Sequence, residues 1–437
     1  MKKYSKYLWV FLAFAMVLGA CEVIEATPPV VEEPTAVVEP APDETDPTTP
    51  IEPTEPLPIV DAEGKMVCTV EGPLFPELTA EQEAEISVFP EVSDADWSIG
   101  PEDAMLTIVE YTDFFCPYCG TAYTAFESLL ETHGDDVRLV YRALPLDSLH
   151  PTAPIAAYAA EAAGQQGKFW EMYRAIFHNQ GNLAQLTAEE LTESLMVTAE
   201  EELELDMNQF KADFESDEVR QKITDGQTAA FEIGINGTPT VLLNRRPISS
   251  GSIPYFGSFI EVMKAEEGLT YECPPFVIDQ EKEYTATIET ENGEMVLELY
   301  PKQAPLAVNS FVHLAREGFY DGVTFHRVFH DFMAQSGDPS ATGMGGAGYR
   351  YREEISPDLT YDEAYMLGVA RTQEEGTSGS QFFITYVPVP QLNDGYTIFG
   401  KLIDGFDVFE MITERDSDSN PNLPIGDKII KITINEK

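Results

Sequence analysis

The pair of cysteines in Cys116-Pro117-Tyr118-Cys119 constrains this chain more than any other feature of its sequence. It follows an apolar run from Met105 to Tyr111, which predicts a buried strand, and it opens a segment of helical character from Ala122 to Thr132. Two thiols three residues apart at a helix start can face one partner, and the positive end of the helix dipole favours the thiolate of the first cysteine. The spacing therefore predicts a redox-active pair at a strand-to-helix junction.

The first residues predict export of the chain. Three lysines among the first six residues precede an apolar stretch from Leu8 to Val17. A charged start and a short apolar core form a secretory signal, and the stretch is shorter than the roughly 20 apolar residues that span a bilayer. The following Leu18-Gly19-Ala20-Cys21 resembles the lipobox of bacterial lipoproteins, which implies that Cys21 is acylated and anchors the chain to the membrane. An ordinary secretory signal with a free Cys21 is the alternative.

Composition limits the remaining possibilities. From residue 22 to about residue 60 the chain is mostly Pro, Glu, Thr and Val, which predicts a disordered, extended tether because little of it can build a core. The net charge of −50 argues against nucleic acid as a partner, since binding phosphates needs a basic stripe and the sequence has none. The length of 437 residues indicates two or three domains.

Further segments accompany the cysteine pair. The run Val137 to Tyr141 predicts a strand, residues 156–163 and 167–170 predict a helical insertion, and Gly234 to Val241 holds Thr238-Pro239 at the start of an apolar strand. Because these segments follow one another in this order, residues 101–268 resemble a thioredoxin-fold oxidoreductase of the DsbA-like family. The resemblance implies a cis proline at Pro239, so that Thr238 and Pro239 border the peptide-binding surface beside the sulfurs.

The same resemblance implies a role for each thiol. Cys116 is the exposed, attacking thiol, and Cys119, one turn into the helix and more buried, resolves the mixed disulfide. A stable disulfide or half of a metal site is the alternative for an isolated pair of this spacing. Because Pro117-Tyr118 places no cation between the cysteines, we expect a potential inside the range of roughly −270 to −120 mV. Oxidase, reductase and disulfide isomerase activities all stay open.

Cys68 and Cys273 flank the predicted redox domain. In an oxidising compartment they favour a structural disulfide that joins the two ends of the domain, but spacing alone leaves that pairing open. A zinc site built from these two cysteines and the redox pair is the competing interpretation. It is disfavoured because the second pair lacks the close spacing of most structural zinc sites. We predict neither a metal nor another cofactor.

The sequence changes character near Tyr284, where two alternating segments flank the turn Glu291-Asn292-Gly293 and predict a hairpin. A helix is expected from Pro305 to Ala315. The motifs that follow are Phe325-His326-Arg327-Val328, Phe332 to Asp338, a glycine loop at 343–348, Ser380 to Ile384, and Tyr396 to Gly400. This series resembles a bacterial cyclophilin. It implies a closed antiparallel barrel capped by two helices, with peptidyl-prolyl cis-trans isomerase activity.

The resemblance also assigns the isomerase site. Rotation about a peptide bond has a barrier of about 18–20 kcal/mol because the C–N bond has partial double-bond character. Arg327 matches the family residue that donates toward the prolyl nitrogen and stabilises the twisted state. The expected substrate-binding residues are Phe332, Met333, Phe383 and Leu392 around the proline ring, Gln335 on the substrate carbonyl or backbone with Gln381 as a supporting polar group, and Ala370 and Tyr396 beside them.

Each of these residues has a simpler alternative, since a lone aromatic residue in a strand is more often part of an ordinary core. His326 and His330 are interpreted as structural, because rotation needs no proton transfer. Gln391 stands where many eukaryotic members carry Trp, and Tyr396 where they carry His. Arg371 follows the Gly368-Val369-Ala370 strip, so we expect it to alter the neighbouring specificity groove.

The sequence thus predicts a multidomain protein with an α/β thioredoxin-like domain, which carries a helical insertion, and an all-β cyclophilin-like domain with two helices. The expected divisions are a signal with the lipidated cysteine (1–21), a tether (22–60), an acidic lead-in (61–100), the thioredoxin-fold domain (101–270), a linker (271–282) and the cyclophilin-like domain (283–437).

The expected partners are exported or unfolded polypeptides with prolyl bonds and thiols, a membrane reached through the lipid, and an unidentified redox partner. We interpret the chain as an envelope folding factor. The alternative is a surface thiol reductase or a scaffold in which the cyclophilin-like part only binds prolyl segments.

Overall fold

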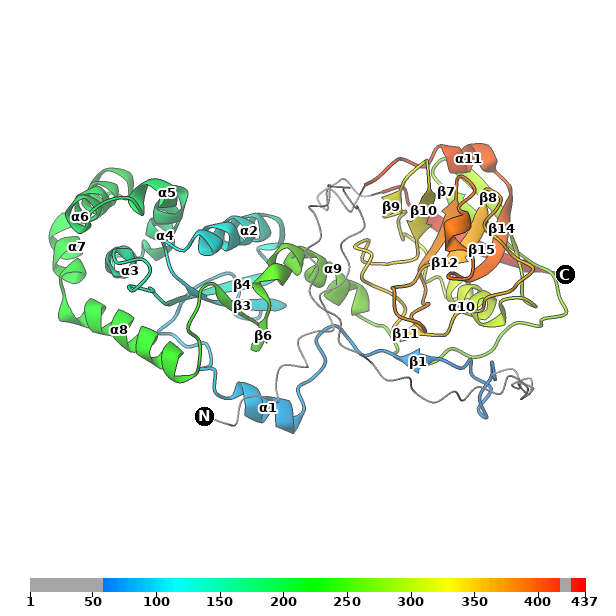
Figure 1. Ribbon diagram of the computed structural model, residues 1–437, viewed down its shortest axis with the longest axis horizontal. Helices are drawn as coiled ribbons and strands as arrows, with labels where there is room; N and C mark the ends of the chain where they lie inside the picture. The colour runs from blue at the N-terminus through cyan, green and yellow to red at the C-terminus, as the bar shows by residue number, and fades with distance from the viewer. Residues whose placement is uncertain (1–57, 417–425) are drawn as a thin grey trace, which may run out of the picture.

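The computed structural model describes residues 58–416 and 426–437, and Figure 1 shows them as two folded parts side by side. The predicted signal, the lipidation site Cys21 and nearly all of the predicted tether lie outside the described residues. Within the part of the chain that the structure describes, no helix combines the length and apolar character needed to cross a membrane.

The N-terminal domain is built on a five-stranded sheet of order β2-β4-β3-β5-β6, in which β3 is parallel to β4 and antiparallel to β5. Alternate residues of β3 face opposite sides of this sheet. Ile108 packs against α2 and α9 on one face, whereas Val109 packs against α8 on the other. The central strand is therefore covered by helices on both faces, which explains its nearly unbroken apolar sequence.

The bounds of the elements in this domain follow the chain. They are α1 (Ala80–Ile86), β2 (Trp97–Ile99), β3 (Leu106–Thr112), α2 (Pro117–His133), β4 (Val137–Ala143), α3 (Ala153–Gly164), α4 (Phe169–His178), α5 (Gln180–Leu183), α6 (Ala188–Val197), the π-helix η1 (Thr198–Glu202), α7 (Met207–Phe214), α8 (Asp217–Glu232), β5 (Thr240–Leu243), β6 (Arg246–Ile248), the 3₁₀-helix η2 (Ser250–Tyr255) and α9 (Phe256–Glu266).

Helices α3 to α8 form the predicted insertion between β4 and β5 (Figure 1). Small side chains on α3 let the neighbouring helices approach closely, and all of its alanines are buried. The aromatic rings of Phe114, Tyr173 and Phe177 continue this core toward the cysteine pair, with centroid separations of 5.1 Å for Phe114–Phe177 and 5.8 Å for Phe114–Tyr173. The insertion therefore packs directly behind the redox motif.

The C-terminal domain is an eight-stranded antiparallel sheet of order β15-β7-β8-β14-β12-β13-β10-β9. The two end strands are not ladder neighbours. Instead, the backbone preceding β9 bonds to the backbone preceding β15, through a bridge between Thr324 and Lys428 and an N–H of Phe325 that donates to Asp427. This contact curls the sheet into a barrel, and Phe311 of α10 is buried in its core.

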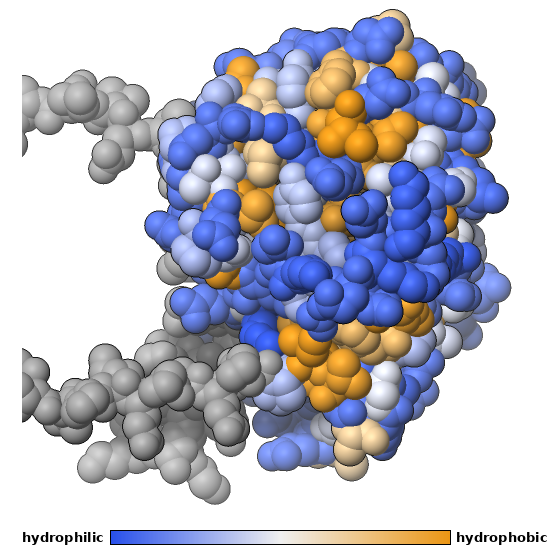
Figure 2. All heavy atoms as spheres, turned by 90° about the vertical axis from the view of Figure 1, so that its right-hand side faces the viewer, coloured by the Kyte–Doolittle hydropathy of each residue, from blue (hydrophilic) through white to orange (hydrophobic). Residues whose placement is uncertain are grey.

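The elements of the C-terminal domain are β7 (Tyr284–Thr290), β8 (Gly293–Leu299), α10 (Pro305–Arg316), β9 (Arg327–Val328), β10 (Met333–Ser336), β11 (Tyr349–Arg350), β12 (Met366–Val369), β13 (Phe382–Thr385), the 3₁₀-helix η3 (Pro390–Leu392), β14 (Ile398–Asp404), α11 (Phe406–Glu410) and β15 (Ile429–Glu436). Seen from the side of this domain, hydrophilic side chains cover most of the surface, and apolar ones gather in separate patches (Figure 2).

A segment from far upstream completes this domain. Residues 58–71, which we name the strap, include β1 (Thr69–Val70), and β1 pairs antiparallel with β11 (Figure 1). The N–H of Met66 donates to Pro274 at 2.8 Å, and the Met66 side chain is fully buried in the core of the C-terminal domain. The strap is therefore a structural part of that domain.

The predicted lead-in at 61–100 is thus divided between the two domains. The strap ends with Glu71, whose N–H donates to Gly348 of the C-terminal domain at 2.9 Å. Only three residues later, the N–H of Leu74 donates to Glu266 of α9 at 2.8 Å, and Leu74 packs on the N-terminal domain. This division could not be predicted from the sequence, because a two-residue strand has no hydrophobic periodicity.

Cys68 and Cys273 form a disulfide with a Cα–Cα distance of 5.7 Å. It connects the strap to the chain that leaves the N-terminal domain, and an ion pair between Lys65 and Glu272 at 2.7 Å lies beside it. The N-terminal domain is therefore an insertion between two segments of the C-terminal domain that are joined covalently. Cys116 and Cys119 are free thiols.

Candidate active sites

The strand-to-helix junction after β3 places the cysteine pair. Cys116 is the N-cap residue of α2, and Pro117 is its first helical residue, where a missing N–H costs no hydrogen bond. The thiol of Cys116 lies 3.4 Å from the carbonyl oxygen of Thr238, and the peptide bond between Thr238 and Pro239 is cis. The structure thus brings together the four residues that were expected to form this site.

The two thiols differ strongly in their electrostatic environment. A hydrogen bond from Cys119, together with the N–H groups of the first helical turn, lowers the pKa of Cys116 to about 5. Burial raises the pKa of Cys119 well above its usual range, and the neighbouring Cys116 and Glu110 act in the same direction. We expected Cys116 to be exposed. Instead only 6% of it is exposed, with the carbonyl oxygen of Thr238 lying 3.4 Å from its sulfur, and Cys119 is fully buried.

Glu110 is a site residue that the sequence analysis missed. It lies on β3 in the buried interior, and burial raises its pKa to about 7. The hydroxyl of Tyr173 donates to one carboxylate oxygen at 3.2 Å, and the other oxygen has no hydrogen-bond partner among the described residues. A buried acid with a pKa near neutrality can hold or release a proton close to Cys119. The sequence signal is a single charge inside the apolar run Leu106–Thr112.

Two polar side chains fix the backbone around Cys116. The amide of Gln180, at the start of α5, donates to the carbonyl oxygens of Phe114 and Cys116, both at 2.9 Å. The buried carboxylate of Asp113 accepts from the N–H of Phe115 at 2.7 Å and lies 2.9 Å from the imidazole of His150. These bonds hold the loop before α2 in one conformation. No sequence pattern identified Gln180.

Arg327 lies on β9, directly opposite Gln335 of β10 in the antiparallel register. Its guanidinium stands over the ring of Phe329, with 4.9 Å between the guanidinium carbon and the ring centroid. The side chain is partly exposed. A cation held on an aromatic face next to a polar side chain can direct its N–H groups at an adjacent substrate atom.

An apolar cluster lies next to this pair and contains the residues expected to hold the proline ring. Its buried members include Met333 and Phe383, on the neighbouring strands β10 and β13. The partly buried members that line it are Phe332, Ala370, Leu392 and Tyr396. The structure therefore gathers all six of these residues at one place. Tyr361, which was not predicted, forms the floor by stacking on Phe383 with centroids 5.8 Å apart.

A chain of amide contacts sets the polar edge of the site. Gln335 donates to the side-chain oxygen of Gln381 at 2.8 Å. Gln381 in turn donates to the carbonyl oxygens of Gly343 and Gly345, at 2.9 and 2.8 Å. The buried carboxylate of Asp338 accepts N–H groups from this same glycine loop, including that of Gly345 at 3.1 Å. The loop therefore orients Gln381, which orients Gln335.

Four other residues that the sequence analysis singled out lie outside the apolar cluster. Gln391 is exposed, so the rim is open where a larger side chain is absent. His330 contacts the carbonyl oxygen of Ile412 at 2.8 Å. His326 is buried, and burial lowers its pKa, so it stays neutral near pH 7. Arg371 was expected to alter the neighbouring specificity groove, and its Nε and one terminal nitrogen donate to the backbone carbonyl oxygens of Gly395 and Thr372.

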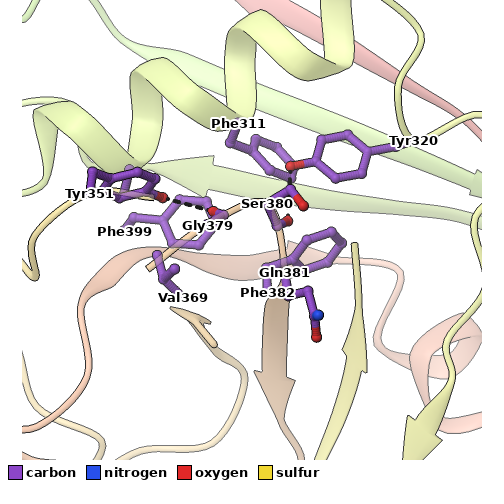
Figure 3. Close-up of a pocket in the computed structure, with 10 residues that line it drawn as sticks. Phe311, Tyr320, Tyr351, Val369, Gly379, Ser380, Gln381, Phe382 and Phe399 are labelled. Atoms are coloured by element: carbon purple, nitrogen blue, oxygen red, sulfur yellow. Dashed lines mark hydrogen bonds between the residues drawn. The ribbon is translucent and has the colours of Figure 1, made fainter. Parts of the chain in front are cut away.

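A small cavity lies inside the barrel behind Gln381 (Figure 3). Its volume is about 10 Å³, and the hydroxyls of Tyr320 and Tyr351 donate to the carbonyl oxygens of Ser380 and Gly379 at its edge, both at 3.1 Å. Such a volume holds at most about one water molecule. This cavity is therefore not the peptide site. Within residues 58–416 and 426–437, no group of His, Cys, Asp and Glu side chains is arranged to hold a metal ion.

Two family models match the chain. Residues 93–261 match the thioredoxin model. Residues 285–434 match the model of the cyclophilin type peptidyl-prolyl cis-trans isomerases.

Curated relatives match the C-terminal part. Peptidyl-prolyl cis-trans isomerase-like 1 of Rhizopus delemar is 42% identical over 146 residues, covering 33% of this chain and 88% of that protein. The probable peptidyl-prolyl cis-trans isomerase A of Mycobacterium bovis is 40% identical over 168 residues, covering 34% of this chain and 92% of that protein. A crystal structure of a cyclophilin type isomerase from Cryptosporidium parvum is 36% identical, with a TM-score of 0.31 and coverage of 36% of this chain and 99% of that one. Through its C-terminal domain, the chain belongs to the cyclophilin-type peptidyl-prolyl cis-trans isomerases, and it carries a thioredoxin-like domain as well.

Proposed function

We propose that the chain isomerises prolyl peptide bonds at the Arg327 site and exchanges thiols and disulfides at the Cys116–Cys119 site. The observation that supports the first activity best is the placement of Arg327 and Gln335 opposite each other, beside the apolar cluster that contains Met333 and Phe383. The strong difference in pKa between the two thiols supports the second.

In the isomerase step, the proline ring of a substrate enters the apolar cluster, and Gln335 holds the adjacent backbone. An N–H of Arg327 then donates to the prolyl nitrogen as its lone pair leaves conjugation with the carbonyl. Because this donation is strongest in the twisted state, it lowers the barrier more than it strengthens substrate binding. No bond is broken, and no proton is transferred permanently.

In the redox step, the Cys116 thiolate attacks one sulfur of a substrate disulfide and expels the other substrate sulfur as a thiolate. Cys119 then loses its proton, for which Glu110 is the nearby acceptor, and attacks the sulfur of Cys116. The second substrate thiolate leaves and takes up a proton. Two electrons pass from the cysteine pair to the substrate, and oxidation of a dithiol substrate runs through the same steps in reverse.

The setting that fits both activities is the folding of exported polypeptides at the cell envelope. Prolyl isomerisation and disulfide exchange are slow steps in folding, with uncatalysed times of seconds to hours. An N-terminal lipid at Cys21 would keep both sites at the membrane surface. A surface thiol reductase whose C-terminal domain only binds prolyl segments is the alternative. It is favoured only if substrate binds without being isomerised.

Substitution of Arg327 tests the isomerase proposal. Arg327→Ala is expected to lower kcat/KM for a proline-containing peptide by about 10²- to 10³-fold, the usual effect of removing one transition-state donor. Arg327→Lys restores the charge without the planar fork and is expected to recover only part of the rate. Peptide binding, followed by chemical-shift titration, should persist in both variants. A wild-type rate in Arg327→Ala would contradict the proposal.

A further inference from the structure

Arg371 is held almost entirely by backbone carbonyl groups. It follows β12, and only 15% of its side chain is exposed. Its Nε donates to the carbonyl oxygen of Gly395 at 2.6 Å. One terminal nitrogen donates to Thr372 at 2.9 Å and to Glu374 at 3.4 Å. The guanidinium therefore ties together two loops that are separated in the sequence.

A partly buried carboxylate, that of Glu353, supports this arrangement. Glu353 lies 3.8 Å from Nε of Arg371, and 12% of its side chain is exposed. Its two oxygens both accept the N–H of Gly376, at 3.1 and 2.9 Å. Glu353 thereby balances the charge of Arg371 and anchors the end of the same loop that Arg371 holds at its start. The pair acts as one clamp on residues 371–376.

Arg371 of this clamp also contacts Tyr396, which belongs to the apolar cluster of the isomerase site. The guanidinium carbon of Arg371 stands 5.0 Å from the centroid of the Tyr396 ring. The ring packs edge-to-face with Phe383 of the apolar cluster, with centroids 6.0 Å apart. Tyr396 belongs to the loop between η3 and β14, outside any strand. Arg371 and Phe383 therefore hold a ring that no strand pairing fixes.

We propose that Arg371 is a positioning residue that fixes Tyr396 as a wall of the prolyl pocket, and thus sets how tightly a peptide binds beside its proline. This inference rests on the proposed isomerase function of the same pocket. Arg371 takes no direct part in bond rotation, since its Nε and one terminal nitrogen donate to backbone carbonyl oxygens and its guanidinium lies against the Tyr396 ring. Lysine cannot reproduce the arrangement, because it lacks the planar fork that bonds several carbonyls at once.

The test measures kcat, KM and the peptide dissociation constant for a proline-containing tetrapeptide, using the full chain and NMR exchange and titration. Arg371→Met is expected to raise KM and the dissociation constant by about fivefold, the usual size of one partly buried cation–π contact, with kcat changed by less than about twofold. The KM and dissociation constant of Arg371→Lys are expected to lie between those of the wild type and Arg371→Met. Arg316→Met is the matched control, because Arg316 pairs with Glu436 outside the pocket and its removal should change neither constant.

A double-mutant cycle tests whether Arg371 acts through Tyr396. In a Tyr396→Leu background, Arg371→Met should have little further effect on peptide binding. Additive effects, or an unchanged dissociation constant in Arg371→Met and Arg371→Lys, would overturn the inference. Because binding is measured without turnover, this result stays separate from the proposed function, which fails instead if Arg327→Ala keeps the wild-type rate.

Discussion

At the scale of single residues, position in the fold makes the two thiols of one motif chemically unequal. Cys116 caps α2, where N–H groups of the first turn and the thiol of Cys119 stabilise its thiolate. Cys119 lies one turn further on, in the interior, where the same charge would have no water around it. The fold thus stabilises the thiolate of Cys116 and keeps Cys119 protonated.

Alkylation of the reduced protein checks this difference. At pH 6 the thiol of Cys116, with a pKa of about 5, is mostly thiolate, while Cys119 stays protonated. We therefore expect iodoacetamide to label Cys116 at least about tenfold faster than Cys119, as read by peptide mass spectrometry. The Cys116→Ser variant should show almost no fast labelling. Equal rates, or faster labelling of Cys119, would contradict the assignment.

The raised pKa of Glu110 predicts that the folding stability of the N-terminal domain depends on pH. Burial raises its pKa to about 7 from 4.5, so the folded state binds a proton that the unfolded state has released. This contribution is fully present below pH 4.5 and is lost as the pH rises through 7. Glu110→Gln should therefore stabilise the reduced N-terminal domain at pH 8 relative to wild type, by at most roughly 3 kcal/mol.

Denaturant unfolding of the wild type and Glu110→Gln at pH 5 and pH 8 measures this difference. Glu131→Gln, at an exposed position of α2, is the matched control and should leave the pH dependence unchanged. A Glu110→Gln variant that keeps the wild-type pH dependence would show that Glu110 does not titrate in this range.

Sequence reasoning found residues that belong to linear motifs and missed residues that arrive through packing. Arg327 and Phe383 were predicted because each lies in a run of family-like residues. Glu110 was overlooked inside an apolar strand, although a charge in a strand buried on both faces is itself a sign of function. Gln180 had no local signal, since only the packing of the helical insertion brings its amide to Cys116.

At the scale of elements, short-range signals were sufficient wherever neighbours in the sequence are neighbours in space. The predicted turn Glu291-Asn292-Gly293 joins β7 to β8, and Thr290 faces Gly293 in their register. Gly293 has a φ of 134°, which few other residues adopt. In contrast, β1 pairs with β11 across about 280 residues, and nothing in Thr69–Val70 indicates that partner. The pairing of short strands that are far apart in the chain could therefore not be predicted from the sequence.

Because Met66 of the strap is buried in the core of the isomerase domain, we predict that it stabilises this domain. Met66→Ala removes a fully buried side chain from the core of that domain and should cost about 2–5 kcal/mol of its stability. Met344→Ala is the matched control, because that methionine is 41% exposed on the same domain. Hydrogen exchange of the barrel strands measures the effect. If Met66→Ala loosened only the N-terminal domain, or nothing, the strap would not belong to the barrel.

At the scale of the whole molecule, the thioredoxin-like domain is an insertion that leaves the isomerase domain at Glu71 and returns near Cys273. The Cys68–Cys273 disulfide closes the base of this insertion. The sequence predicted both domains and their order, as the family matches at 93–261 and 285–434 confirm. Only the structure shows how the lead-in at 61–100 is divided between the two domains, because this depends on which hydrophobic core buries Met66.

We propose that one chain carries two separate active sites, and paired single substitutions distinguish them. Prolyl isomerisation of a peptide and reduction of an insulin-type disulfide are to be measured on the wild type, Arg327→Ala and Cys116→Ser. We expect Arg327→Ala to lose isomerisation by about 10²-fold or more but to keep disulfide reduction, and Cys116→Ser to lose disulfide reduction but keep isomerisation. Full isomerisation by Arg327→Ala, or its loss in a folded Cys116→Ser, would contradict the claim.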